Sequence, residues 1–188
     1  MTGAMDVRDL ADLIRSRRTS MLVDSERHVP DDLVRQLCEL AQWAPNHKRT
    51  WPWRFATVTG NGRARLGDTI ADCMALRGDP PDKVLKARSK YLRTPTTLIV
   101  GTAAGDSELR TAENRDAVAA GIQNLMLGAT ATGLASYWGS CATGANDAVA
   151  RFAGFDADTH ITGLIYLGWA TATIAAPERP AVLINHVS

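Results

Sequence analysis

Apolar residues recur every three or four positions at the start of the chain, in the pattern of an amphipathic helix. Val7, Leu10, Ala11 and Ile14 follow Asp6, whose carboxylate can cap that helix. We expect this helix to pack one face against the rest of the protein. The same reasoning predicts helices over residues 30–44, 63–76, 83–92, 113–132 and 146–152. The predicted buried stripe of the second helix consists of Leu33, Leu37, Leu40 and Ala41.

Shorter stretches with β-branched and aromatic residues predict strands around residues 53–59, 96–100, 134–138 and 161–167. Asn146 is the expected cap of the helix that starts there, and the helix over 83–92 has a strongly basic outer face. A further apolar run, 182–184, lies in the Ala-rich and Pro-containing tail. The mixture of elements predicts an α+β fold, with a small central mixed sheet covered by helices.

The predicted helix over 113–132 is polar at its start and apolar nearly all round afterwards, which favours burial on several sides. Its small residues Gly121, Gly128 and Ala131 would let another helix approach closely. Such a helix is either a central element of the domain or part of a subunit interface, and it is consistent with an obligate dimer.

Length and composition are those of one globular domain over residues 1–188, because 45% of the residues are hydrophobic and 22% are charged. The formal net charge of +1 argues against nucleic-acid binding. No apolar run approaches the length of about 20 residues that spans a bilayer, so we expect no membrane insertion and a cytoplasmic location.

Three cysteines, Cys38, Cys73 and Cys141, are widely spaced and lack partners at metal-ligand spacing. This pattern fits a reducing compartment and no metal site. Cys38 and Cys73 are expected as core residues, and Cys141, although it follows Ser140, has no His or Lys partner that would make it a nucleophile.

Two adjacent arginines and a hydroxyl, Arg17-Arg18-Thr19, end the first predicted helix. Guanidinium groups offer bidentate, charge-assisted donors, so this cluster suits a phosphate monoester. The alternative is that cations simply gather at a helix C-terminus because the macrodipole favours them there. No dinucleotide-binding glycine turn and no P-loop occurs in the chain, so a nucleotide would have to be bound in another way.

Two later segments accompany the arginines in a fixed order: Ala44-Pro45 through Pro52-Trp53, and Gly133 through Trp138. Together the three resemble the motifs of the FMN-dependent nitroreductase family, in particular its short bacterial NAD(P)H nitroreductases. The resemblance covers about residues 7–180. It implies a homodimer that binds FMN at the subunit interface, takes hydride from NAD(P)H and reduces nitroaromatic, quinone-like or other conjugated acceptors.

The resemblance also implies site residues. Arg17, Arg18 and Thr19 would receive the FMN phosphate, and His47 would reach the flavin from the other subunit. The backbone of Trp138-Gly139-Ser140 would pass the flavin ring and donate an amide hydrogen bond to its reactive nitrogen. Arg179 is a further candidate for the phosphate, or else an exposed tail residue. The flavin carries out the redox step, so no catalytic acid, base or nucleophile is nominated.

Three positions depart from the family pattern. Met21 stands where many relatives have a basic residue that stabilises reduced flavin, and Lys48 or Arg49 could substitute for it. Trp43 and Trp51 also replace polar residues of the relatives, and we expect both indoles to be packed rather than to line the pocket. The departures leave two alternatives open: a flavin-sequestering protein with little turnover, and a helical interaction domain whose arginines bind anions.

Overall fold

The computed structural model describes residues 6–187 and builds an α+β domain from six α-helices and four β-strands in that range. In chain order these are α1 (Val7–Ser16), α2 (Asp31–Gln42), β1 (Trp53–Val58), α3 (Gly62–Leu76), α4 (Pro81–Lys90), β2 (Thr96–Thr102), α5 (Glu108–Ala131), β3 (Leu134–Gly139), α6 (Asn146–Ala153) and β4 (His160–Trp169). Two single 3-10 turns, η1 (His47–Arg49) and η2 (Tyr91–Arg93), follow α2 and α4.

The four strands form one sheet in the order β1-β2-β4-β3, and every neighbouring pair is antiparallel. The predicted α+β class is confirmed, but the expectation of a mixed sheet is wrong for these strands. After β1, the helices α3 and α4 return the chain to the same end of the sheet, so β2 runs antiparallel to β1. Strands β2 and β3 run in the same direction, but they are not neighbours because β4 lies between them. Within residues 6–187, parallel pairing is limited to an isolated bridge between Thr19 and Ser136.

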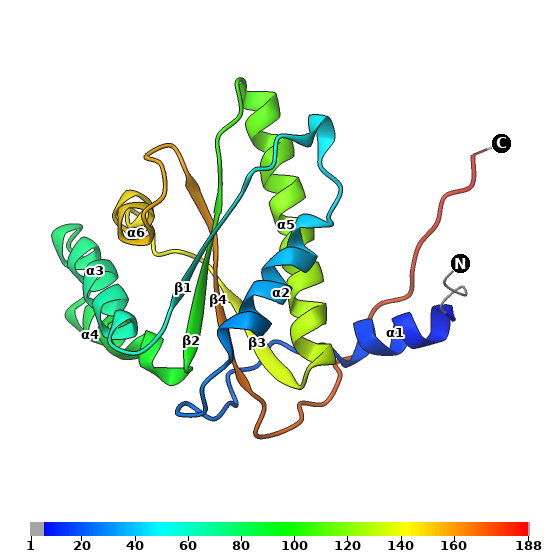
Figure 1. Cartoon of the computed structure of the whole chain (residues 1–188), viewed down its shortest axis with the longest axis horizontal. Coiled ribbons are helices and arrows are strands. Elements are labelled where there is room, and N and C mark those ends of the chain that lie inside the picture. Colours follow the sequence, from blue (N-terminus) through cyan, green and yellow to red (C-terminus); the bar gives the residue numbers. More distant parts are fainter. Residues whose placement is uncertain (1–5, 188) are drawn as a thin grey trace.

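Helices cover both faces of the sheet, as Figure 1 shows: α2 and α5 lie on one face, and α3, α4 and α6 lie on the other. Side chains alternate along the strands, so each strand contributes to both cores. In β2, Leu98 and Val100 pack with α2 and α5, whereas Ile99 packs with α3 and α6. In β4, Ile165 belongs to the first core and Tyr166 to the second.

Helix α5 is longer than predicted because it begins at Glu108, where Ser107 caps it by accepting a hydrogen bond from the Arg110 amide. Its small residues serve a contact within the chain. A Cβ atom on Gly121 would lie 2.6 Å from the Ala41 carbonyl oxygen, and one on Gly128 would lie 2.6 Å from Leu40 Cδ1. The close approach predicted for another helix is therefore that of α2 in the same chain.

Several local predictions need correction. The predicted buried stripe of α2 included Leu40, which is 44% exposed, and omitted Val34, which is buried. The buried face is rotated toward Val34 because α2 packs against both α5 and the sheet. Asn146 is the first residue of α6 and not its cap; its side chain instead accepts from the Ile161 amide and donates to the Thr159 carbonyl. These bonds attach α6 to the start of β4.

Helix α1 begins as predicted, with the Asp6 carboxylate accepting from the Arg8 amide, but it has no buried residue. The expected packing face is uncovered in the single chain: Val7 is 73% exposed and Ile14 is 46% exposed. The tail after β4 carries the apolar run 182–184 in the open as well. Figure 1 shows α1 and the tail projecting from the same side of the molecule. Among residues 6–187, no helix is long and apolar enough to cross a membrane.

Candidate functional site

A cavity of about 920 Å³ lies between α4, η2 and the loop that follows β3. Ser140 and Ala142 line it from the loop, and Tyr91 and Arg93 line it from η2. Val23 enters from the extended segment that follows Arg17-Arg18-Thr19. The cavity therefore lies between the loop at Ser140 and the segment that continues the first motif.

The wall of this cavity is positively charged. Lys83, Lys86 and Lys90 line it together with Arg93, and they are three of the four lysines in the chain. Among the described lining residues there is no Asp or Glu. Burial, with the nearby charge of Arg93, holds the pKa of Lys90 below that of a free lysine. The arrangement favours an anionic ligand, because the cations have no acidic counterpart in the wall.

Aromatic side chains lie beneath the cavity. Tyr91 is buried and stacks on Tyr166, with ring centroids 5.7 Å apart, and Tyr137 meets Tyr166 edge-on. Lys90 Nζ lies 5.6 Å from the centroid of the Tyr166 ring. Met21, the residue that departs from the family pattern, packs as an apolar residue against the larger core cluster that contains Tyr91 and Tyr166.

The first motif is extended and runs next to β3. The Arg17 amide donates to the Leu13 carbonyl at the end of α1, and the Ser20 amide donates to the Ser136 carbonyl. Arg18 and Ser20 line a separate cavity of about 170 Å³ near the end of α5. Because side chains alternate in an extended segment, Arg17 and Thr19 are expected on the opposite side, toward Met21.

The segment Trp138-Gly139-Ser140 also divides between two surfaces. The Trp138 indole donates to the Thr162 carbonyl at 3.1 Å and lines a different cavity, with Arg115 and His160. A Cβ atom at Gly139 would lie 3.0 Å from Tyr166 Cε2, so the ring approaches the backbone closely there. Only Ser140 of the three lines the cationic cavity.

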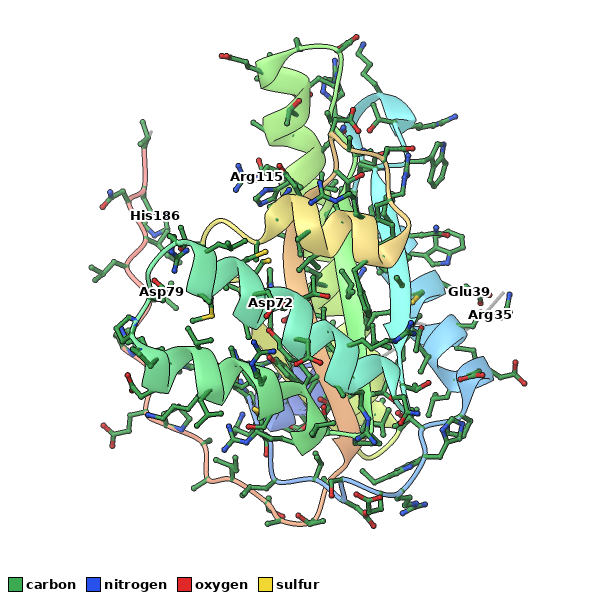
Figure 2. All side chains as sticks on the ribbon, turned by 90° about the vertical axis from the view of Figure 1, so that its left-hand side faces the viewer. Arg35, Glu39, Asp72, Asp79, Arg115 and His186 are labelled. Carbon is green, nitrogen blue, oxygen red and sulfur yellow. The ribbon has the colours of Figure 1, made fainter. Side chains whose placement is uncertain are left out.

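Arg77 at the end of α3 holds the loop after Ser140. Its guanidinium donates to the Thr143 carbonyl and forms an ion pair with Asp79, which Figure 2 labels at the end of α3. Gly144, the next residue, has a φ of +78°, a conformation that favours glycine. Arg77 therefore links the loop that contains Ser140 to the end of α3.

His47 lies far from the first motif of its own chain. Its Nδ1 atom is 2.9 Å from Glu113 Oε1, near the start of α5, and this hydrogen bond with the charge of Arg110 lowers the pKa of Glu113. Arg18 instead lies with Thr130 near the end of α5. Since a helix rises about 1.5 Å per residue, Glu113 and Thr130 are about 25 Å apart along α5. Within one chain, His47 and Arg18 therefore lie near opposite ends of α5.

The two unusual tryptophans are exposed, so the expectation that they pack is wrong for the single chain. Trp43 is 84% exposed at the end of α2, and Trp51 is 59% exposed after η1. The loop around η1 has a strained backbone, because Lys48, Arg49 and Trp51 all have positive φ, between 51° and 62°. Trp51 lies against Trp53 of β1, with ring centroids 6.2 Å apart, and most of Trp43 and of Trp51 remains exposed.

Arg179 and two of the cysteines, Cys38 and Cys141, do not line the cavity. Arg179 is in the exposed tail after β4, away from the regular elements. Burial raises the pKa of Cys141 to about 11 and that of Cys38 to about 12, so both thiols stay protonated at neutral pH.

The cations of α4 are the residues that the sequence reasoning missed as site residues. Lys83, Lys86 and Lys90 are spaced three and four residues apart, which puts them on one side of a helix. That spacing was visible as a basic outer face. Only the tertiary structure shows that this face borders a cavity, which the loop at Ser140 lines from the other side.

Comparison with known proteins identifies the family. The family model "Nitroreductase family" matches residues 14–169. The Bacillus subtilis (strain 168) protein YfhC, an NAD(P)H nitroreductase by name, is 33% identical over 135 residues, which cover 70% of this chain and 69% of YfhC. Of solved structures, a nitroreductase-like family protein from Bacillus cereus superposes with a TM-score of 0.76 at 28% identity, covering 96% of this chain and 94% of that one. The FMN-dependent nitroreductase NfnB from Mycobacterium smegmatis, solved with NADPH, has a TM-score of 0.71 at 22% identity and covers 88% of this chain and 90% of its own. This chain belongs to the nitroreductase family.

Proposed function

We propose that this protein is an FMN-dependent oxidoreductase that takes hydride from NAD(P)H and reduces nitroaromatic, quinone-like or other conjugated acceptors. The observation that carries the proposal is the cation-lined cavity at Ser140, which adjoins the segment after Arg17-Arg18-Thr19. The family membership supports the same reaction, and NfnB is named as FMN-dependent.

The residues around the cavity fit a flavin mononucleotide. A flat ring system needs an apolar surface, which Ile70, Met74 and Tyr91 provide in the lining. The phosphate needs cationic and hydroxyl donors, which Arg17 and Thr19 offer at the end of α1, in the segment that leads to Val23 of the lining. The lining carries no carboxylate among the described residues, so nothing in it repels an anionic cofactor.

Each group has a separate task in this proposal. FMN, when bound, supplies the reversible uptake of a hydride. Arg17 and Thr19 bind the phosphate, and the backbone at Gly139-Ser140 donates a hydrogen bond to the ring. Lys90, which is partly buried in the wall, provides the positive charge that Met21 cannot. In this proposal Lys90, and not Lys48 or Arg49, stabilises the negative charge of the reduced flavin.

The complete site requires a second copy of the chain. His47 is too far from Arg17 within one chain, and α1 presents an uncovered apolar face. We propose a homodimer in which His47 and the neighbouring exposed tryptophans of one protomer face the flavin bound by the other. A small acceptor molecule then enters the cavity after the nicotinamide leaves.

An absorbance spectrum tests the function directly. We expect purified protein to be yellow and to be bleached by NADPH or NADH in the absence of oxygen. Colour that the reductant leaves unchanged, together with slow NAD(P)H oxidation in the presence of menadione or a nitrofuran, would favour the alternative of a flavin-sequestering protein. Colourless protein that FMN does not stabilise against heat would contradict flavin binding altogether.

Paired variants locate the phosphate. Because Arg18 lines the separate cavity near α5, Arg17→Ala should weaken FMN binding more than Arg18→Ala. Loss of one charged hydrogen bond is worth about 1.5–3 kcal/mol, or about 10- to 100-fold in the dissociation constant. Arg15→Ala, at an exposed position two residues earlier, is the matched control and should bind FMN normally. Retained flavin in Arg17→Ala with loss in Arg18→Ala would move the phosphate to the other side of the segment.

A further inference from the structure

Three lysines form a graded stripe along α4. From Lys83 to Lys90 the helix rises by seven residue steps, or about 10 Å. Lys90 is half-buried at the inner end, while Lys83 and Lys86 are exposed at the outer end. All three line the same cavity as Ser140. The stripe therefore runs from the interior of the site to its mouth.

The outer lysines are not used to hold the fold together. Arg88, on the side of α4 that faces α3, forms ion pairs at 2.7 Å with both Asp68 and Asp72. Lys86 only approaches Asp82, at 3.6 Å and with both side chains exposed, a kind of pair that contributes little. Lys83 has no carboxylate within 4.0 Å among the described residues. The helix thus separates its structural cation from the cations at the cavity.

The local charge is strong against a nearly neutral background. The chain has a formal net charge of +1, yet four cations and no acid line this cavity within the part of the chain that the structure describes. Lys90 and Arg93 lie near each other at the inner end. The proposed function puts the flavin ring beside Lys90, so a nicotinamide on that ring would leave the adenosine part of the dinucleotide toward Lys83 and Lys86.

We infer that Lys83 and Lys86 bind the 2′-phosphate of NADPH and make this enzyme prefer NADPH over NADH. The inference rests on the proposed function and adds the choice of electron donor. A 2′-phosphate carries nearly two negative charges at neutral pH, whereas NADH has a neutral hydroxyl at that position. Two ammonium groups at the mouth therefore distinguish the donors by charge, with no change at the reacting ring.

The test uses the flavin-loaded protein with Lys83→Gln/Lys86→Gln. The control, Arg35→Gln/Arg151→Gln, removes the same charge from exposed positions on α2 and α6. Figure 2 shows Arg35 on α2, away from α3 and α4. Two measurements are made on each protein: kcat/KM with NADPH and with NADH, and calorimetric binding of 2′,5′-ADP and of 5′-AMP, which lacks the 2′-phosphate.

We expect the lysine variant to lose about five- to tenfold in kcat/KM for NADPH and in affinity for 2′,5′-ADP, because two exposed charge contacts are removed. Values for NADH and 5′-AMP should stay unchanged, and the control should behave as the wild type. An equal loss with both donors, or no loss with either, would overturn the inference. The flavin spectrum and bleaching by NADH report separately on the proposed function, since neither depends on a 2′-phosphate.

Discussion

At the scale of single residues, Lys90 is a positive charge that the fold partly buries in the wall of the site. Its ammonium group lies above Tyr166 and next to Arg93, and both the partial burial and the neighbouring cation lower its pKa. A base with a lowered pKa in the folded protein is charged at a cost, so the charge of Lys90 opposes folding at neutral pH. Lys90 therefore contributes its positive charge to the site and not to the stability of the fold.

Lys90→Met should lower the reduction potential of the bound flavin, because the reduced ring loses a nearby positive charge. A loss of about 1.4 kcal/mol of stabilisation corresponds to about 30 mV for a two-electron couple. In the wild type this contribution should disappear as pH rises through the lowered pKa of Lys90, below 10.5, and Lys90→Met should lack that step. Redox titration across pH measures both effects.

Lys48→Met is the informative comparison, since Lys48 was the alternative source of this charge. A potential that falls in Lys48→Met and stays constant in Lys90→Met would contradict the role given to Lys90. The melting temperature of Lys90→Met should be equal to or higher than that of the wild type, which separates a loss of charge from a loss of fold.

At the scale of elements, α2 and α5 approach each other closely at two glycines. Gly121 faces backbone: a Cβ there would lie 2.6 Å from the Ala41 carbonyl oxygen and also 2.6 Å from Trp53 Nε1. Gly128 faces only the ends of Leu37 and Leu40 side chains. One helix therefore carries a glycine that the packing requires and a second whose neighbours can move.

Gly121→Ala should destabilise the protein by about 1–3 kcal/mol, since an added methyl in a filled contact forces α2 and α5 apart. Gly128→Ala is the matched variant in the same helix. There the gain in helix propensity, about 0.5–1 kcal/mol, offsets the movement of two leucine side chains, and stability should change little. Chemical denaturation of both variants measures the difference, and equal losses would contradict this account of the contact.

At the scale of the whole molecule, the single chain leaves apolar surface uncovered where the site is incomplete. Leu10 and Ile14 of α1 are 42% and 46% exposed, and the tail beyond β4 exposes Leu183 and Ile184. Both segments leave the body on the same side, as Figure 1 shows. A second copy would bury this surface and bring its His47 to the flavin, so assembly and cofactor binding should be coupled.

Leu10→Glu should shift the protein toward monomers, because the carboxylate would be buried against the partner. We expect at least a tenfold weaker dimer and a parallel loss of bound FMN, measured by sedimentation and by the flavin absorbance of each fraction. Arg15→Glu introduces the same side chain at an exposed position of α1 and should remain dimeric with its flavin. A Leu10→Glu monomer that keeps all its FMN would contradict an interface site.

The elements and the family could be predicted from the sequence alone. Helices and strands follow from short-range periodicity, and α1, β3 and β4 were expected close to their observed bounds. The order of three motifs was enough to indicate nitroreductases. The polar first turns of α5 escaped prediction because no apolar repeat marks them; Ser107 as a cap was the available signal.

Tertiary structure decided how these pieces meet. Only the fold places the lysines of α4 in the wall of the same cavity as Ser140, which follows them by about fifty residues in the sequence. The fold also places Arg18 in the wall of a different cavity. Tertiary structure also brings α2 against the glycines of α5 and leaves the apolar face of α1 exposed in the single chain. The physical reason is that periodicity is set by neighbours three or four residues away, whereas the surroundings of a charge are set by segments that the chain brings together from afar.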